Sequence, residues 1–205
     1  MKRRHFALLL LAGGVAAVAG GRAATRADAV LPTSLRPASD FAAIADPAQR
    51  SLALFGEVGK VLQHPRCMNC HPATDRPTQT DAMRPHMPGV VGAEGGIGAP
   101  GLHCNACHQQ ENYDVAGVPG NPKWALAPAE MAWQGKTIGE ICRQIKDPER
   151  NGGRDMAALQ EHMATDELVG WGWHPGGDRT PVPGTQAQFG ILFKAWVDSG
   201  AHCPA

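Results

Sequence analysis

The chain contains one five-residue pattern twice, as CMNCH at residues 67–71 (the first motif) and CNACH at residues 104–108 (the second motif). Three kinds of site use a Cys-x-x-Cys pair: a tetrahedral zinc site, a redox dithiol at a helix start in a βαβ unit, and a c-type haem site. Only the haem site uses the histidine of both copies, because two thiols form thioethers to the porphyrin and the histidine binds iron. The repeat therefore predicts two c-type haems.

This interpretation assigns roles to six residues. The covalent attachment points are Cys67, Cys70, Cys104 and Cys107. The proximal iron ligands are His71 and His108. The motifs begin 37 positions apart, and chains below about 40 residues rarely hold a core of their own. Both haems must then share one fold as neighbours, which favours electron transfer between them.

Residues 1–29 are predicted to form a cleaved signal peptide. A positive n-region, Met1 to His5, precedes an apolar run and the A-x-A site at residues 27–29. A membrane anchor would need about 20 strongly apolar residues, and this run is shorter and interrupted by glycine. We therefore expect a periplasmic protein without membrane insertion after cleavage. Arg3-Arg4 is similar to a twin-arginine signal for folded export, but haem attachment needs an unfolded chain after export, so we interpret the pair as ordinary n-region charge.

The formal charge argues against a nucleic-acid partner. The chain has 19 basic and 19 acidic residues, and loss of residues 1–29 leaves 14 basic and 18 acidic residues, a formal charge of −4. Nucleic-acid binders usually show clustered positive charge. A redox partner with a basic surface would meet this protein faster.

The rest of the chain is predicted to be mostly α. Residues 30–45 look like a linker or N-terminal arm, and residues 46–205 form a single dihaem cytochrome c-like domain with short helices and long Gly/Pro-rich loops. Helices are expected after Asp46-Pro47, from Ile138 to Lys146, after Asp155, and from about Thr185 to Ser199. The Gly/Pro-rich segment 72–103 lies between the two motifs and is expected to wrap a ligand.

Two cysteines lie outside the motifs. In an oxidising compartment Cys142 and Cys203 are expected to form a disulfide, with a free thiol or a metal ligand as alternatives. A disulfide that closes this loop of about 60 residues would contribute roughly 4 kcal/mol to folding stability through loop-closure entropy.

The ligand opposite each proximal histidine decides between electron transfer and small-molecule chemistry. Two histidines are the first candidates: His86, in a proline-stiffened segment, and His162, on the helix after Asp155. The alternatives are Met83, Met87, Met131 and Met163. For Met131 and Met163, plain core packing competes with ligation. The five tryptophans are expected to line the porphyrins or to fill the core.

About residues 50–203 resemble a family of small periplasmic dihaem cytochromes, often labelled as subunits of isoquinoline 1-oxidoreductase-type molybdenum hydroxylases. The resemblance lies in CMNCHPATDRPTQTD, PHMPGVVG, HCNACHQQEN, GVPGNPKWALAPAEMAWQG, KDPERNGG and HMATDELVGWGWHPG. It implies an electron-carrying subunit or partner of such a dehydrogenase. The hydroxylase itself is not implied, because the chain has no room for a molybdenum domain and lacks the cysteines of an iron–sulfur domain.

Three functions are therefore compared. The first is electron transfer from a dehydrogenase or hydroxylase partner to a respiratory acceptor, which is not an enzymatic activity of this chain. The second is a peroxidase-like haem enzyme with one open iron site, although dihaem peroxidases are usually larger with motifs farther apart. The third is a haem-based sensor or assembly module.

Overall fold

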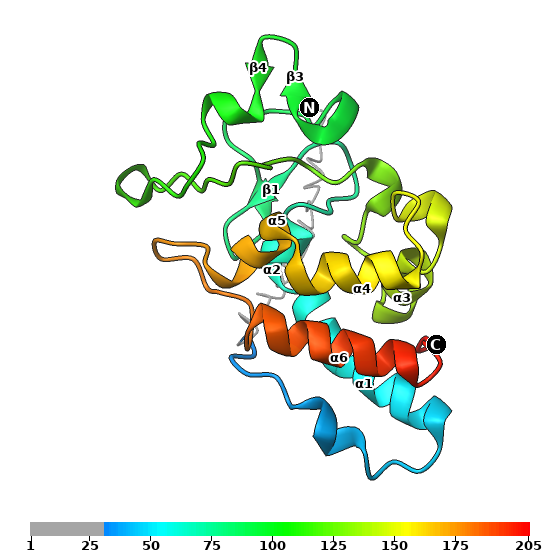
Figure 1. Cartoon of the computed structure of the whole chain (residues 1–205). Helices are drawn as coiled ribbons and strands as arrows, with labels where there is room; N and C mark the ends of the chain where they lie inside the picture. The colour runs from blue at the N-terminus through cyan, green and yellow to red at the C-terminus, as the bar shows by residue number, and fades with distance from the viewer. Residues whose placement is uncertain (1–30) are drawn as a thin grey trace, which may run out of the picture. The chain divides into compact units, whose positions relative to one another are not determined.

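The structure is a computed structural model that describes residues 31–205 (Figure 1). It contains six α-helices among these residues, is about 44% helical and has little sheet. The expected mostly-α class is confirmed. The predicted signal peptide lies outside the described residues.

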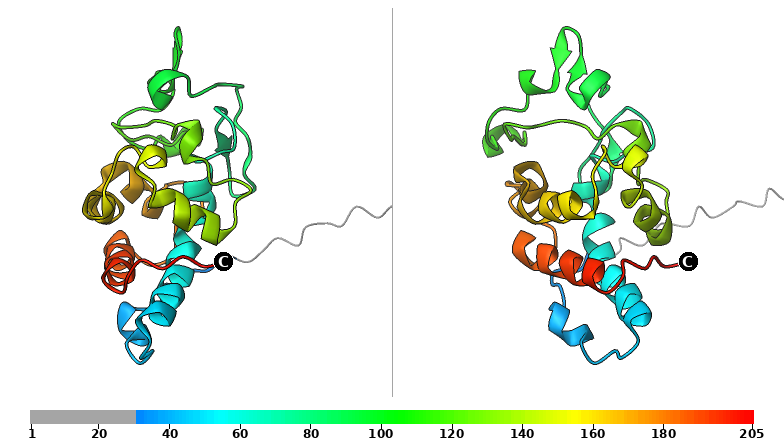
Figure 2. Two further views of the ribbon diagram at one scale, coloured as in Figure 1. Left: turned by 90° about the vertical axis from the view of Figure 1, so that its right-hand side faces the viewer. Right: turned by 45° about the vertical axis from the view of Figure 1, so that its right-hand side comes forward.

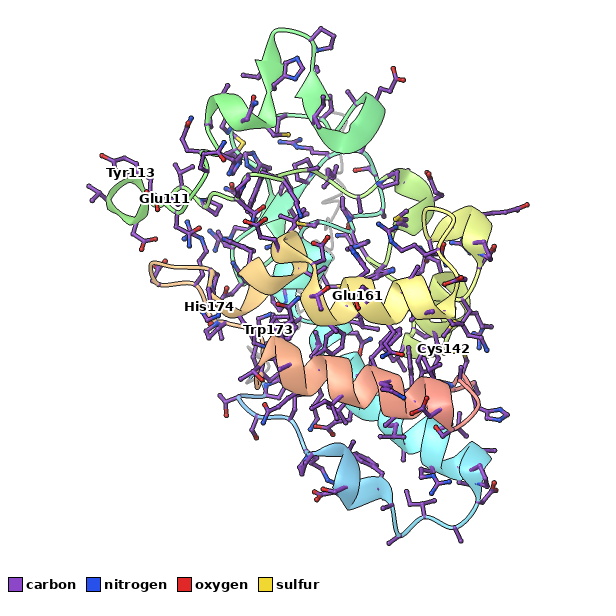
Figure 3. The ribbon with its side chains drawn as sticks, in the orientation of Figure 1. Glu111, Tyr113, Cys142, Glu161, Trp173 and His174 are labelled. Atoms are coloured by element: carbon purple, nitrogen blue, oxygen red, sulfur yellow. A yellow bond between two sulfur atoms is a disulfide. The ribbon has the colours of Figure 1, made fainter. Side chains whose placement is uncertain are left out.

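Three helices form the main packed layer. Helix α6 (Gln186–Asp198) packs against both α1 (Pro47–Leu62) and α4 (Met156–Thr165), and Figure 2 shows α6 lying beside α1. Fully buried aromatic rings join these helices, since Trp196 lies 4.7 Å from Phe55 and 5.0 Å from Phe193, measured between ring centroids. Trp173, labelled in Figure 3, reaches Phe189 at 5.6 Å. This apolar layer is the core from which the two motifs extend.

Side-chain caps set where the helices begin. Asp46 accepts a hydrogen bond from the Ala48 amide ahead of α1, with Pro47 as the first helical residue. Thr137 and Glu140 form a capping box at the start of α3 (Ile138–Ile145). Asp155 caps α4 by accepting a hydrogen bond from the Ala158 amide, without a capping box. The predicted helix starts are confirmed.

Helix α6 also begins with a capping box, formed by Thr185 and Gln188. Its C-terminal end leads to Gly200 and then to Cys203, which is bonded to Cys142 of α3 with a Cα–Cα distance of 5.5 Å. The expected disulfide is confirmed, and it ties the last residues of the chain to α3, where Cys142 is labelled in Figure 3.

The segment 31–45 packs onto this layer. Leu35 and Phe41 are buried in the core, and Phe41 ends the short 3-10 helix η1 (Ala38–Phe41). The buried carboxylate of Glu57 in α1 accepts a hydrogen bond from the Arg36 amide at 2.8 Å. Segment 31–45 is therefore an arm that packs against α1.

The remaining chain is mostly loop. Two antiparallel pairs of two-residue strands lie between the motifs, with β1 (Thr78–Gln79) opposite β2 (Arg84–Pro85) and β3 (Gly98–Ala99) opposite β4 (Leu102–His103). The loops outside the main helices also contain short helical turns. Two of them, α2 and α5, are α-helical, and the others are 3-10 helices. They are α2 (Pro65–Met68), η2 (Glu94–Gly96), η3 (Cys104–Ala106), η4 (Asp114–Ala116), η5 (Ala129–Met131), η6 (Pro148–Arg150), α5 (Glu167–Gly170) and η7 (Trp171–Trp173). Within residues 31–205, no helix has the length and apolarity needed to cross a membrane.

Candidate functional site

Each motif forms one tight turn of backbone. In the first motif, which begins within α2, the Cys70 amide donates to the Cys67 carbonyl at 3.1 Å. In the second, the Cys107 and His108 amides both donate to the Cys104 carbonyl, at 3.2 and 2.9 Å. The turn brings both cysteines and the histidine of each motif to the wall of one cavity.

The first cavity has a volume of about 290 Å³ and lies beside the helical core. Cys67, Cys70 and His71 line it, and so does His162 of α4. Buried core side chains form much of the remaining wall. They are Val61, Leu62, Trp133, Ile145, Leu159, Met163 and Phe189. This cavity is therefore part of the same apolar interior that holds the helices together.

The second cavity, of about 760 Å³, is lined by Cys104, Cys107, His108 and His86. Its walls come from the loops between and after the motifs, and none of the described residues that line it belongs to the main core cluster. Its volume falls in the range of sites for small molecules and cofactors, about 300–1,000 Å³, and the first cavity lies at the lower end of that range.

The two motif histidines have matching surroundings. His71 Nδ1 lies 2.8 Å from the Met131 carbonyl oxygen, and His108 Nδ1 lies 2.7 Å from the Pro119 carbonyl oxygen. A carbonyl only accepts, so each Nδ1 carries the proton and each Nε2 keeps a free lone pair. Metal-binding histidines in proteins are usually held in this way.

Each motif histidine also stacks on a tryptophan. The ring of His71 lies 3.7 Å from that of Trp133 at an interplanar angle of 4°, and that of His108 lies 4.5 Å from Trp124 at 13°. Burial lowers the pKa of His71 to about 4, opposed by its hydrogen bond to Met131, and burial likewise lowers the pKa of His108. Both imidazoles are therefore neutral at pH 7, as metal ligation requires.

The two candidate distal histidines are separated by the structure, one to each cavity. His162 shares the first cavity with His71, and its Nδ1 lies 3.4 Å from Asp166 Oδ2. His86 shares the second with His108, and its ring centroid lies 5.9 Å from that of His108. His86 Nδ1 donates to the Pro88 carbonyl at 2.9 Å. In both histidines, a contact between Nδ1 and an oxygen atom orients the ring, and Nε2 stays available for another partner.

The four candidate methionines are distributed less evenly. Met131 and Met163 line the first cavity, and Met87 lines the second while 68% exposed. Met83 lines neither and packs against the edge of the core. Met131 contacts His71 through its carbonyl oxygen. Distal ligation by a methionine stays a prediction, as does ligation by His86 or His162, and one of these two histidines lines each cavity.

A common wall separates the two cavities. Both are lined by Arg66, Cys70, Ala125, Leu126 and Trp171. The Ala127 amide donates to the Cys70 carbonyl at 3.0 Å, and the Leu126 amide to the Gly96 carbonyl at 2.8 Å. Gly96 has φ +72°, and a Cβ there would lie 1.9 Å from the Leu126 carbonyl oxygen, so the wall requires glycine at this position. Groups bound in the two cavities would be immediate neighbours.

The motif cysteines are free thiols in this structure. Burial raises the pKa of Cys67 to about 12 and that of Cys70 to about 11, and burial raises the pKa of Cys104. Redox dithiols and zinc sites use thiolates of lowered pKa. Within residues 31–205, no three His, Cys, Asp or Glu side chains come together at a distance suited to one metal ion.

Several site residues had no signal in the sequence. The carbonyl groups of Met131 and Pro119 orient the motif histidines, and backbone oxygen atoms carry no residue-type signature. Of the five tryptophans, Trp124, Trp133 and Trp171 line the cavities, and Trp133, Trp173 and Trp196 belong to the core. Trp133 does both, and contact of these rings with a porphyrin stays a prediction.

Comparison with known proteins gives no match: no family model, no curated protein and no solved structure is significantly similar to the chain.

Proposed function

We propose that this protein is a periplasmic dihaem c-type cytochrome. It belongs to the family that its sequence resembles, accepts electrons from a dehydrogenase or hydroxylase partner and passes them to a respiratory acceptor. Cys67 and Cys70 hold the first haem, and Cys104 and Cys107 hold the second. His71 and His108 are the proximal ligands, with His162 and His86 as their distal counterparts.

One observation carries the proposal: in each cavity, two histidines have Nδ1 next to an oxygen atom and Nε2 unassigned. His103 also lines the second cavity, but its ring makes no hydrogen bond within residues 31–205, and His64, which lines neither cavity, has the reverse arrangement. His64 Nδ1 accepts from the Arg66 amide at 3.2 Å, so His64 caps α2 and is not prepared as a ligand. The donor set thus fits a haem with a nitrogen ligand on each face.

The chemistry of the group is one-electron transfer at iron. The chain's part is to fix each imidazole, to exclude water, and to hold the two sites side by side. In the first cavity the core side chains form an apolar wall. The shared wall, which includes Cys70 and Leu126, keeps the two sites adjacent. If His162 and His86 bind the irons together with His71 and His108, no iron position would remain open for a substrate, which would favour electron transfer over the peroxidase-like alternative.

The spin state of the irons tests this function. We expect optical and electron paramagnetic resonance spectra of the oxidised, exported protein to show two low-spin irons, because each iron has a strong ligand on both faces. A large high-spin fraction that changes when cyanide or peroxide is added would contradict electron transfer and support the enzyme alternative.

A further inference from the structure

Arg66 is a buried cation at the boundary of the two cavities. It is the second residue of α2 and directly precedes Cys67, and its side chain is only 2% exposed. The side chain lines the first cavity and the second. An ionised group removed from water needs oxygen partners that replace its hydration.

Among the residues that the structure describes, the Arg66 guanidinium has a hydrogen-bond partner at only one of its nitrogen atoms, Nη2. Nη2 donates to Asp81 Oδ1, and Asp81 is 40% exposed and also accepts a hydrogen bond from Thr180 Oγ1 at 2.5 Å. The buried Nε of Arg66 has no hydrogen-bond partner within residues 31–205. A guanidinium presents its donors as a planar fork that matches a carboxylate, so Arg66 retains capacity for a second anionic oxygen.

Other arginines in the cavities lack this combination. Arg154, which lines only the first, donates to the Asn151 carbonyl at 2.8 Å. Arg179, which lines only the second, donates to the carbonyls of Pro175 and Gly176 at 3.0 and 3.2 Å. Arg66 is distinguished by its burial, by its unpaired Nε and by its position at both cavities.

We propose that Arg66 is a carboxylate-binding residue that holds a propionate of the bound porphyrin, and that its charge raises the reduction potential of both haems. The proposal rests on the proposed function. Reduction adds one electron, so it makes a site more negative. A cation nearby stabilises the reduced form, and the effect is strong where water is excluded. Because one side chain lines both cavities, both potentials should depend on it.

The test is a spectroelectrochemical titration of both haems in the holoprotein with single substitutions. Arg66→Gln should lower the equilibrium constant for reduction about tenfold at each haem, which is about 59 mV for a one-electron couple. Arg66→Lys should retain most of the potential, since it keeps the charge. Asp81→Asn should shift both potentials upward, because it removes the negative partner and leaves Arg66 in place. Arg36→Gln, at a side chain 55% exposed and away from both cavities, is the charge control and should change neither.

The potential shifts expected for Arg66→Gln and Asp81→Asn have opposite signs, and this distinguishes an effect of charge from a purely structural effect. If Arg66 only fastened α2 to Asp81, the Arg66→Gln and Asp81→Asn variants would break the same contact and shift the potentials in the same direction, which would overturn the proposal. Unchanged potentials in both variants would also overturn it. If Arg66→Gln does not fold, Asp81→Asn alone decides. A wild-type protein without covalent haem would instead reject the proposed function.

Discussion

The double substitution Cys67→Ala/Cys70→Ala is expected to cost up to about 7 kcal/mol of folding stability, whereas Cys104→Ala/Cys107→Ala leaves the helical core folded. The first figure applies about 24 cal/mol per Å³ of unfilled cavity to the 290 Å³ of the first cavity. Because whole domains are stable by about 5–15 kcal/mol, such a loss would remove about half of that stability or more.

The asymmetry follows from what lines each cavity. The first is walled by core side chains such as Leu62, Leu159 and Phe189, so an absent haem leaves a hole between packed helices. The second is walled by loops that lie outside the core cluster. Thermal unfolding of the exported variants, followed by circular dichroism, measures the difference. Equal unfolding temperatures for the two variants would contradict a first haem that completes the core.

Replacing either distal histidine is expected to convert one haem, and only one, to the high-spin state. His162→Ala should affect the haem of the first motif, and His86→Ala that of the second, so about half of the low-spin signal should disappear in each variant. Added imidazole should restore it by entering the space that the side chain leaves.

His202→Ala is the matched control, because His202 is exposed and lines neither cavity. Its spectrum should equal that of the wild type. A low-spin spectrum that survives in His162→Ala would point to Met163 or Met131 as the sixth ligand, and the assignment of His162 would be wrong. The same result for His86→Ala would point to Met87.

The helices were predictable because their signals are local. Asp46-Pro47 and the Thr137/Glu140 capping box act within one turn of chain, and both mark helix starts in the structure. The mostly-α class followed from such signals. The folding of segment 109–135 was not predictable, since it depends on contacts between distant residues. The Trp133 amide, for example, donates to the His71 carbonyl across 62 positions.

The motifs identified His71 and His108 as candidate ligands, and the abundance of nearby His and Met suggested His86 and His162. The sequence does not indicate which of these two candidate histidines lines a cavity with which motif. His86 lies between the motifs in the chain, 15 residues after His71 and 22 before His108. The spacing alone therefore does not assign His86 to either motif. Pairing depends on the path of the loop, in which the His86 amide donates to the Pro77 carbonyl at 3.0 Å after β2. Arg66 was also not identified, because its importance lies in burial at the boundary of two cavities.

Intact mass spectrometry of the exported, purified protein tests the central claim most directly. Haem that is attached through thioether bonds stays on the denatured chain, whereas haem that is bound non-covalently dissociates from it. The account predicts a mass equal to that of the chain cleaved after residue 29 plus two covalently attached haems, with one haem lost in Cys104→Ala/Cys107→Ala. A mass equal to that of the bare polypeptide would contradict the account.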